Sequence, residues 1–146
     1  MQLTSIVFIG LLAGLGAAIP VVSQPIAEWS VWNTTRGRND NNTVCEWNLT
    51  IRDDTSGRPA ETCQFMVEAA EKKPCDQVQF HNIPCSAESD WVMNGGYSEY
   101  QAFMVLVVYN VREKAKAYFG FPSQDLNKGR LIPKKIEPAY PTHPKA

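Results

Sequence analysis

Four cysteines carry the most definite chemistry in this sequence: Cys45, Cys63, Cys75 and Cys85. Their irregular spacing contains no Cys-x-x-Cys pair, so it does not favour a zinc site. An even number of cysteines in an oxidising compartment predicts two disulfides instead. Paired cysteines leave no thiol to act as a nucleophile, so we expect no metal, no cofactor and no catalytic cysteine.

Acid–base catalysis has few candidate residues in this chain. Histidine is the commonest general base, and the sequence holds only His81 and His143. A ribonuclease-like site would pair His81 with a carboxylate on a facing strand, for which Glu68 is the candidate. The sequence contains no Gly-x-Ser-x-Gly, His-Glu-x-x-His, P-loop or Rossmann motif. We therefore expect no catalytic residues, with a small secreted hydrolase or ribonuclease as an alternative.

Tryptophan and arginine side chains are the candidates for binding a partner. Three tryptophans fall on the apolar face of predicted strands and indicate core packing: Trp29, Trp47 and Trp91. Trp32 is out of phase with this pattern and is the candidate for an exposed ligand contact. The candidate binding arginines accompany loops expected at 34–44 and 52–61: Arg36, Arg38 and Arg58. Loops on a rigid scaffold commonly carry contacts, so we expect these two loops to form the recognition surface.

The first 18 residues are uncharged and mostly apolar, as in a secretory signal peptide. The apolar run at 6–15 is too short to span a bilayer, and small residues precede a cleavage before Ile19. An alternative cleavage follows Ser23. Three Asn-x-Ser/Thr sequons agree with secretion and give candidate glycosylation sites: Asn33, Asn41 and Asn48. No later stretch is as long as a membrane helix, so we expect no membrane span.

Apolar and polar residues alternate along most of the mature chain, as they do in half-buried strands. The predicted strands lie at 29–31, 45–51, 63–69, 78–80, 91–93, 103–109 and 115–119. A helix over 100–118 is the main competitor, but the β-branched residues of 105–111 favour strands. One helical turn is expected at 123–126. The pattern predicts an all-β domain at 19–132, an antiparallel β-sandwich or β-barrel stapled by two disulfides.

Proline punctuates the last 14 residues at four positions. Proline at that density is not expected to extend a central strand. We therefore predict a Pro-rich, basic tail at 133–146, extended and partly draped along the body.

The order of the predicted strands favours one disulfide pairing. Three consecutive segments form a meander that runs up, down and up: 45–51, 62–69 and 76–81. Cys45 and Cys75 then lie near one end of the meander, and Cys63 and Cys85 lie near the other. The pairing 45–75 with 63–85 therefore costs least, and two other connectivities remain open.

The net charge of −1 is the sum of two unequal parts. Residues 19–111 hold six basic and twelve acidic side chains, whereas residues 112–146 hold eight basic and three acidic ones. The simpler interpretation is that the two parts attract each other and dock the tail. The functional interpretation is a basic strip, including Lys134 and Lys135, for a cell-wall polyanion or a membrane surface. The near-neutral total argues against a dedicated nucleic-acid binder.

Several motifs together resemble a known group of proteins. They are Trp29-Ser30-Val31-Trp32-Asn33 with Arg36, Cys45-Glu46-Trp47-Asn48-Leu49-Thr50-Ile51, Cys63-Gln64-Phe65-Met66-Val67, Ile83-Pro84-Cys85, Phe103-Met104-Val105-Leu106-Val107-Val108 and Ala117-Tyr118-Phe119-Gly120-Phe121. The pattern resembles the small cysteine-containing secreted proteins of filamentous fungi. Within that group it is similar to the hypersensitive-response-inducing elicitors of plant pathogens, such as those of rice blast. Some of these share the β-barrel of the Alternaria major allergen.

This resemblance implies a secreted, non-enzymatic fungal effector or elicitor. It would act in the plant apoplast, where plant cells perceive it and respond with cell death or defence. The implied partner is a plant extracellular receptor or defence protein, with a cell-wall polysaccharide as a further one. A cell-wall carbohydrate-binding module is the alternative from a different functional class.

Overall fold

The computed structural model describes residues 23–142 of the chain. The elements follow in the order β1 (Ala27–Arg38), β2 (Val44–Asp53), β3 (Glu61–Glu68), β4 (Phe80–Pro84), β5 (Trp91–Ser98), β6 (Phe103–Asn110), β7 (Ala115–Pro122), α1 (Ser123–Asn127) and β8 (Lys135–Pro141). The predicted signal peptide at 1–18 and His143 lie outside the described residues.

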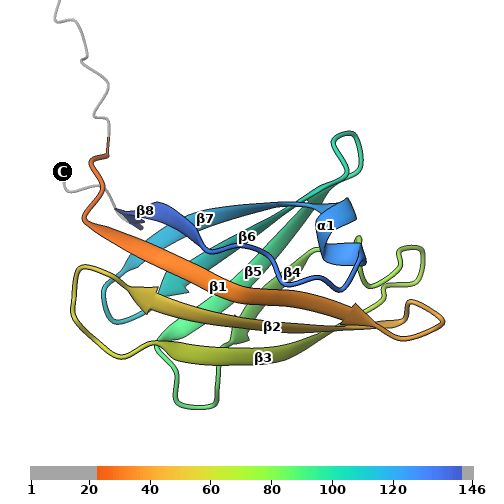
Figure 1. Ribbon diagram of the computed structural model, residues 1–146, viewed down its shortest axis with the longest axis horizontal. Coiled ribbons are helices and arrows are strands. Elements are labelled where there is room, and N and C mark those ends of the chain that lie inside the picture. The colour runs from red at the N-terminus through yellow and green to blue at the C-terminus, as the bar shows by residue number, and fades with distance from the viewer. Residues whose placement is uncertain (1–22, 143–146) are drawn as a thin grey trace, which may run out of the picture.

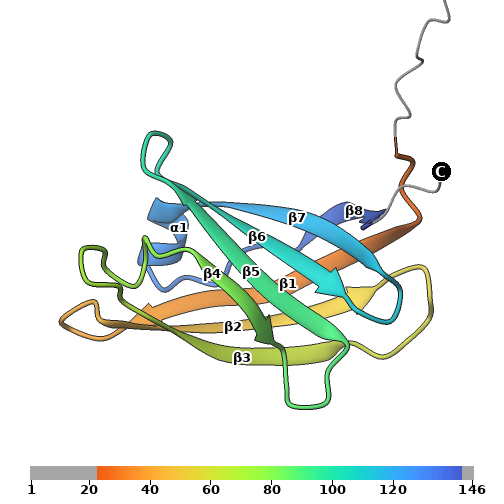
Figure 2. The ribbon, with the colours of Figure 1, turned by 180° about the vertical axis from the view of Figure 1, so that it is seen from behind.

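The strands form one antiparallel sheet that curls into a nearly closed barrel (Figures 1 and 2). Their spatial order is β3-β2-β1-β8-β7-β6-β5-β4. The prediction of an all-β barrel or sandwich is confirmed, and the barrel is the form adopted. The alternative prediction of a helix over 100–118 is wrong. The chain there forms β6 and the start of β7, and these two strands pair along their whole length.

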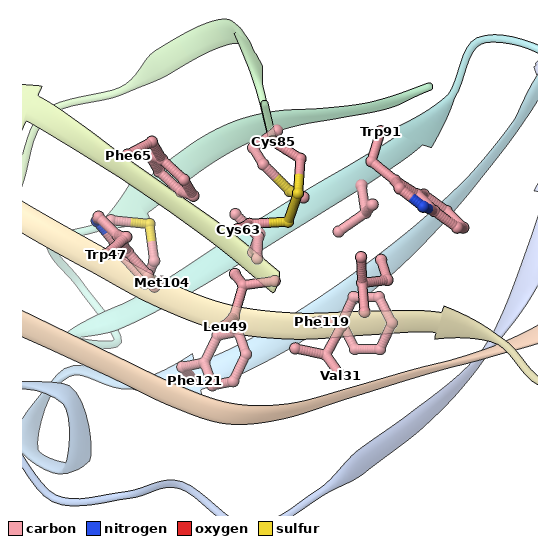
Figure 3. Close-up of a cluster of buried hydrophobic side chains, with 14 of the residues drawn as sticks. Val31, Trp47, Leu49, Cys63, Phe65, Cys85, Trp91, Met104, Phe119 and Phe121 are labelled. Atoms are coloured by element: carbon pink, nitrogen blue, oxygen red, sulfur yellow. A yellow bond between two sulfur atoms is a disulfide. The ribbon is translucent and has the colours of Figure 1, made fainter. Parts of the chain in front are cut away.

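Alternation along each strand places one set of side chains inside the barrel. In β6, Met104, Leu106 and Val108 are at most 1% exposed, whereas the residues between them are half-exposed. Trp29 and Trp91 meet edge to face, with ring centroids 4.8 Å apart. Side chains from opposite walls interdigitate in this way to form one continuous core (Figure 3).

The barrel wall is interrupted at a seam between its edge strands β3 and β4. Within residues 23–142, backbone ladders join the neighbouring strands around the wall, and none joins β3 to β4. Cys63 of β3 and Cys85, directly after β4, form a disulfide across this gap (Figure 3). The rings of Phe65 and Phe80 also meet across the seam, 5.6 Å apart. A covalent bond and aromatic packing thus close the barrel where no backbone ladder does.

The second disulfide joins Cys45 of β2 to Cys75 in the connection between β3 and β4. Both disulfides therefore have the pairing that the meander favours. The predicted third strand at 76–81 is wrong, however, because β4 runs from Phe80 to Pro84 and pairs with β5 instead of β3.

A β-bulge in β1 reverses the inside–outside alternation of that strand. Trp32 pairs with Thr50 and Thr35 pairs with Asn48, so β1 carries one extra residue between these pairs. Asn33 lies in this bulge with a φ of 52°, a conformation that asparagine tolerates better than most residues. Odd-numbered residues face the core before the bulge, and even-numbered residues face it afterwards.

The segment predicted as a Pro-rich tail forms strand β8 in the interior of the sheet. Five residue pairs join β8 to β1, and two join it to β7. The expectation that proline keeps this segment out of a central strand is wrong. Proline removes only the bonds that its missing N–H would donate, and the short ladder with β7 requires few of them.

The predicted helical turn is present as α1, which covers one end of the barrel (Figure 1). Ser123 and Leu126 of this helix are buried. Among residues 23–142, no helix is long and apolar enough to cross a bilayer.

Removing the seam disulfide with Cys63→Ala and Cys85→Ala is expected to lower the free energy of unfolding by about 3 kcal/mol. The reason is that the bond closes a chain separation of 22 residues and so restricts the unfolded chain. Urea unfolding measures the loss. Hydrogen exchange should become faster in β3 and β4 than in β6. An unchanged free energy of unfolding would show that packing alone holds the seam.

Replacing Gly95 by alanine is expected to destabilise the barrel by about 1–3 kcal/mol, because the new Cβ would overlap the ring of Phe80. Phe80 is packed between Trp47 and Phe65 and has little room to move. Gly96→Ala is the matched control, since a Cβ there meets nothing within 4 Å. Equal melting temperatures for the two variants would contradict this expectation.

Candidate functional site

The loops of the barrel gather at two ends (Figure 1). The helix end carries α1 with the loops at 39–43, 69–79 and 99–102. The opposite end carries the loops at 54–60, 85–90 and 111–114. The two loops predicted to share a recognition surface therefore lie at opposite ends. Each predicted loop is also shorter than expected, because β1 continues to Arg38 and β2 to Asp53.

Asp76 organises the polar contacts of the helix end. Its carboxylate is buried and accepts hydrogen bonds from Arg38 Nη1 at 3.2 Å and Asn42 Nδ2 at 3.1 Å. The backbone N–H of Cys75 also donates to the carbonyl of Asn42 at 2.9 Å. These bonds and the Cys45–Cys75 disulfide hold the 39–43 and 69–79 loops together. The helix end is consequently a rigid surface.

Arg36, a predicted binding residue, is only 3% exposed and belongs to the interior. Its guanidinium lies 5.5 Å from the ring centroid of Trp47 and donates to the carbonyl of Asp76 at 3.2 Å and to the side chain of Asn127. Burial lowers its pKa, against the attraction of Asp76. The bulge at Asn33 explains the error, because it turns Arg36 from the outer to the inner face of β1.

A shallow hollow lies beside the turn between β1 and β2. It is lined by Gly37, Arg38, Asn39, Val44, Glu46 and Met66. Met66 is 68% exposed, and the Arg38 side chain is about half exposed. An exposed apolar side chain among charged groups can contact a protein partner, because methionine adapts its shape to the surface that it meets. The exposure of Met66 could be predicted from the sequence, because it lies on the polar face of its strand. Its position beside Arg38 could not be predicted.

The sequons lie on the outer surface at three different sites. Asn33 is exposed at the bulge, Asn41 is exposed in the turn at the helix end, and Asn48 is half-exposed in β2 opposite Gln64. Asn48 alternates with the buried Trp47 and Leu49 and therefore lies on the outer face of β2. Glycosylation at all three sites stays a prediction.

Trp32 lies half-exposed on the outer face, between two cations. Arg52 Cζ and Lys134 Nζ are each 5.6 Å from the centroid of its ring. Such distances allow cation–π attraction. The out-of-phase position of Trp32 could be predicted from the sequence, but its neighbours could not, because Lys134 reaches it only through the pairing of β8 with β1.

The opposite end holds a small group of carboxylates. Arg58, a predicted binding residue, forms an ion pair with Glu113 at 3.2 Å and so ties the 54–60 loop to the β6–β7 turn. Asp53 is buried and accepts hydrogen bonds from the backbone N–H groups of Thr55 and Ser56. Desolvation and the charge of Asp53 raise the pKa of Glu113, against the lowering effect of Arg58.

The residues considered for catalysis are not assembled into a site. His81 of β4 and Glu68 at the end of β3 are both exposed, and the hydrogen bonds found in residues 23–142 do not join them. The described part of the chain contains no group of three or more His, Cys, Asp or Glu side chains placed to hold a metal ion. The geometry is that of a disulfide-linked scaffold with exposed side chains near its loops.

One family of known proteins matches this chain. The model of the family described as Effector TSP1 matches residues 30–145. The match covers all four cysteines and extends from β1 through β8. A search of curated proteins finds no match.

Replacing Glu113 by glutamine is expected to stabilise the protein increasingly as the pH rises. The raised pKa of Glu113 means that the folded state binds its proton more tightly than the unfolded state does, so wild-type stability is lost as the pH rises through that pKa. Asp53, Asp90 and Arg58 are the charged groups that act on Glu113, and all three are kept in the variant.

Melting temperatures of wild type and Glu113→Gln between pH 4 and pH 7 measure this effect. Glu99→Gln is the matched control with the opposite sign, because a hydrogen bond from Lys73 lowers the pKa of Glu99. That contribution is present at higher pH and lost as the pH falls. If the melting temperatures of wild type and Glu113→Gln changed in parallel with pH, the raised pKa of Glu113 would be disproved.

Proposed function

We propose that this chain, which belongs to the Effector TSP1 family, is a secreted fungal effector that plant cells recognise in the apoplast. Membership of the family makes the chain an effector. The proposal adds the place of action and the response, which is a hypersensitive response or another plant defence. The fungal origin and the response both come from the resemblance to secreted fungal elicitors.

The two disulfides support secretion, because such bonds persist in oxidising compartments. The proposed signal peptide at 1–18 would bring the chain there, and the mature domain would begin at Ile19 or after Ser23. The three sequons would be accessible to glycosylation on the same route.

The rigid hollow at the helix end is the observation that carries the recognition mechanism. Met66 and Arg38 are exposed beside one another, on a base held by the Cys45–Cys75 disulfide and by Asp76. A surface that is already ordered loses little conformational entropy on binding. We therefore place the contact with a plant extracellular receptor or defence protein at the helix end, and we assign Arg36 a supporting role beneath it.

A non-enzymatic mechanism is part of this proposal. It is supported by the exposure of His81 and Glu68, which no hydrogen bond found in residues 23–142 joins, and by the ion pair of Asp54 with Arg52. Although burial opposes it, hydrogen bonds from Ser30 and Arg52 lower the pKa of Asp54, so this carboxylate is a poor general acid.

Infiltration of purified protein into leaves tests the proposal, with cell death and the oxidative burst as readouts. Met66→Glu is expected to raise the dose that gives half the response about tenfold, because hot-spot contacts contribute at least 1–2 kcal/mol. Val111→Glu is the matched control, since Val111 is 57% exposed in the 111–114 loop, which lies at the opposite end of the barrel.

Two results would overturn this proposal. A wild-type protein that causes neither cell death, nor an oxidative burst, nor defence-gene induction is not recognised as proposed. Equal responses to Met66→Glu and Val111→Glu would remove recognition from the helix end. Circular dichroism and melting temperatures confirm that both variants are folded.

A further inference from the structure

A segment of the outer surface carries cations without carboxylates. From residue 126 to residue 136 the chain holds Lys128, Arg130, Lys134 and Lys135 and no acidic residue. Lys128, Arg130 and Lys134 are exposed. Lys135 is half-buried, with its Nζ 5.5 Å from the ring centroid of Phe121, so it stabilises the barrel instead.

The fold lays this segment along β1. The backbone N–H of Ile132 donates to the carbonyl of Thr34 at 3.1 Å, and Lys135 pairs with Val31. Lys134 is thereby placed beside Trp32, which Arg52 approaches from β2. We call Arg52, Lys128, Arg130 and Lys134 the cation strip.

Apolar surface accompanies the cation strip. Leu131 is 64% exposed and lines a hollow with Lys128 and Arg130, together with Asp125, Ile132 and Pro133. Trp32 is half-exposed beside the other two cations. The strip therefore combines positively charged side chains with one exposed aliphatic side chain, Leu131, and one half-exposed aromatic side chain, Trp32.

Asp54 is the acidic group nearest to Arg52 and limits the charge of the strip. Its carboxylate binds Arg52 Nη2 at 2.6 Å and the hydroxyl of Ser30. Although burial opposes it, these hydrogen bonds and the charge of Lys134 hold the pKa of Asp54 below its usual value. Asp54 therefore positions Arg52 and leaves three cations of the strip to meet an anion.

We propose that the cation strip binds a polysaccharide of uronic acids. Such a chain carries one carboxylate on each sugar, which can pair with the lysine and arginine side chains. Its sugar rings also present C–H faces that pack on Trp32 and Leu131. A polyuronate therefore suits both kinds of group on this surface: its carboxylates pair with the cations, and its ring faces pack on Trp32 and Leu131.

The charge around the strip favours one narrow polymer over a nucleic acid or a bilayer. Residues 19–111 have twice as many acidic as basic side chains, and Asp125 and Glu137 bound the basic segment. A densely charged duplex or a broad anionic membrane would bring phosphates against these carboxylates. A single polyuronate chain can follow the strip alone. The binding does not depend on the recognition proposed at the helix end.

Binding to polygalacturonate by isothermal titration calorimetry tests this inference. The double variant Arg130→Gln/Lys134→Gln is expected to bind about tenfold more weakly than wild type, because two exposed ion pairs are lost. Lys72→Gln/Lys114→Gln is the matched control, since it removes the same charge from exposed lysines outside the strip. It should bind like wild type.

Two further measurements separate charge from sugar contact. Fully methyl-esterified polygalacturonate lacks the carboxylate charge and should not bind detectably. The tryptophan fluorescence of wild type should change on titration with polygalacturonate. That change should disappear in Trp32→Phe, because Trp29 and Trp47 are buried and Trp91 is 7% exposed.

The outcomes decide between the alternatives. No binding to polygalacturonate by wild type, or equal binding by the two double variants, would overturn the proposal. Equal or tighter binding to RNA or to vesicles of anionic lipid would show a general anion surface and would overturn it as well. A wild-type leaf response with no polygalacturonate binding would reject this inference and leave the effector proposal intact.

Discussion

The closure of the barrel at its seam is the constraint on which the rest of the structure depends. A curled sheet has two edges with unpaired backbone groups, and β3 and β4 are those edges here. The Cys63–Cys85 disulfide and the contact of Phe65 with Phe80 join them without a ladder. Because these contacts hold the two edges together, the core stays enclosed. The surface proposed for recognition is held by a second set of bonds, those of Asp76 and of the Cys45–Cys75 disulfide.

The bulge at Asn33 divides the two roles of β1. Before it, Trp29 and Val31 fill the core, and Trp32 remains outside between two cations. After it, Arg36 turns inward and braces the helix end from below. One extra residue thus separates the proposed polysaccharide contact from the support of the proposed protein contact.

The sequence predicted most of the wall and little of the surface. Period-two alternation located β1 to β3 and β5 to β7, because it depends on short segments of chain, and the expected order of the first strands indicated the disulfide pairing. Three features could not be predicted: the inward turn of Arg36, the role of β8 and the group formed by Trp32, Arg52 and Lys134. The first depends on a single inserted residue, and the others depend on which distant strands become neighbours. Proline content argued against the strand that creates the last of these groups.

The position of β8 determines when the barrel can form. The strands β1 to β3 and β4 to β7 are two meanders that pair locally, and β8 is the strand whose ladders connect them. It is also the last strand of the described chain to leave the ribosome. During synthesis the two halves consequently remain unjoined, and assembly of the barrel waits for residue 141. A barrel that closes only when β8 has been made would suit the proposed secretion, in which the chain crosses a membrane unfolded and acquires its disulfides afterwards.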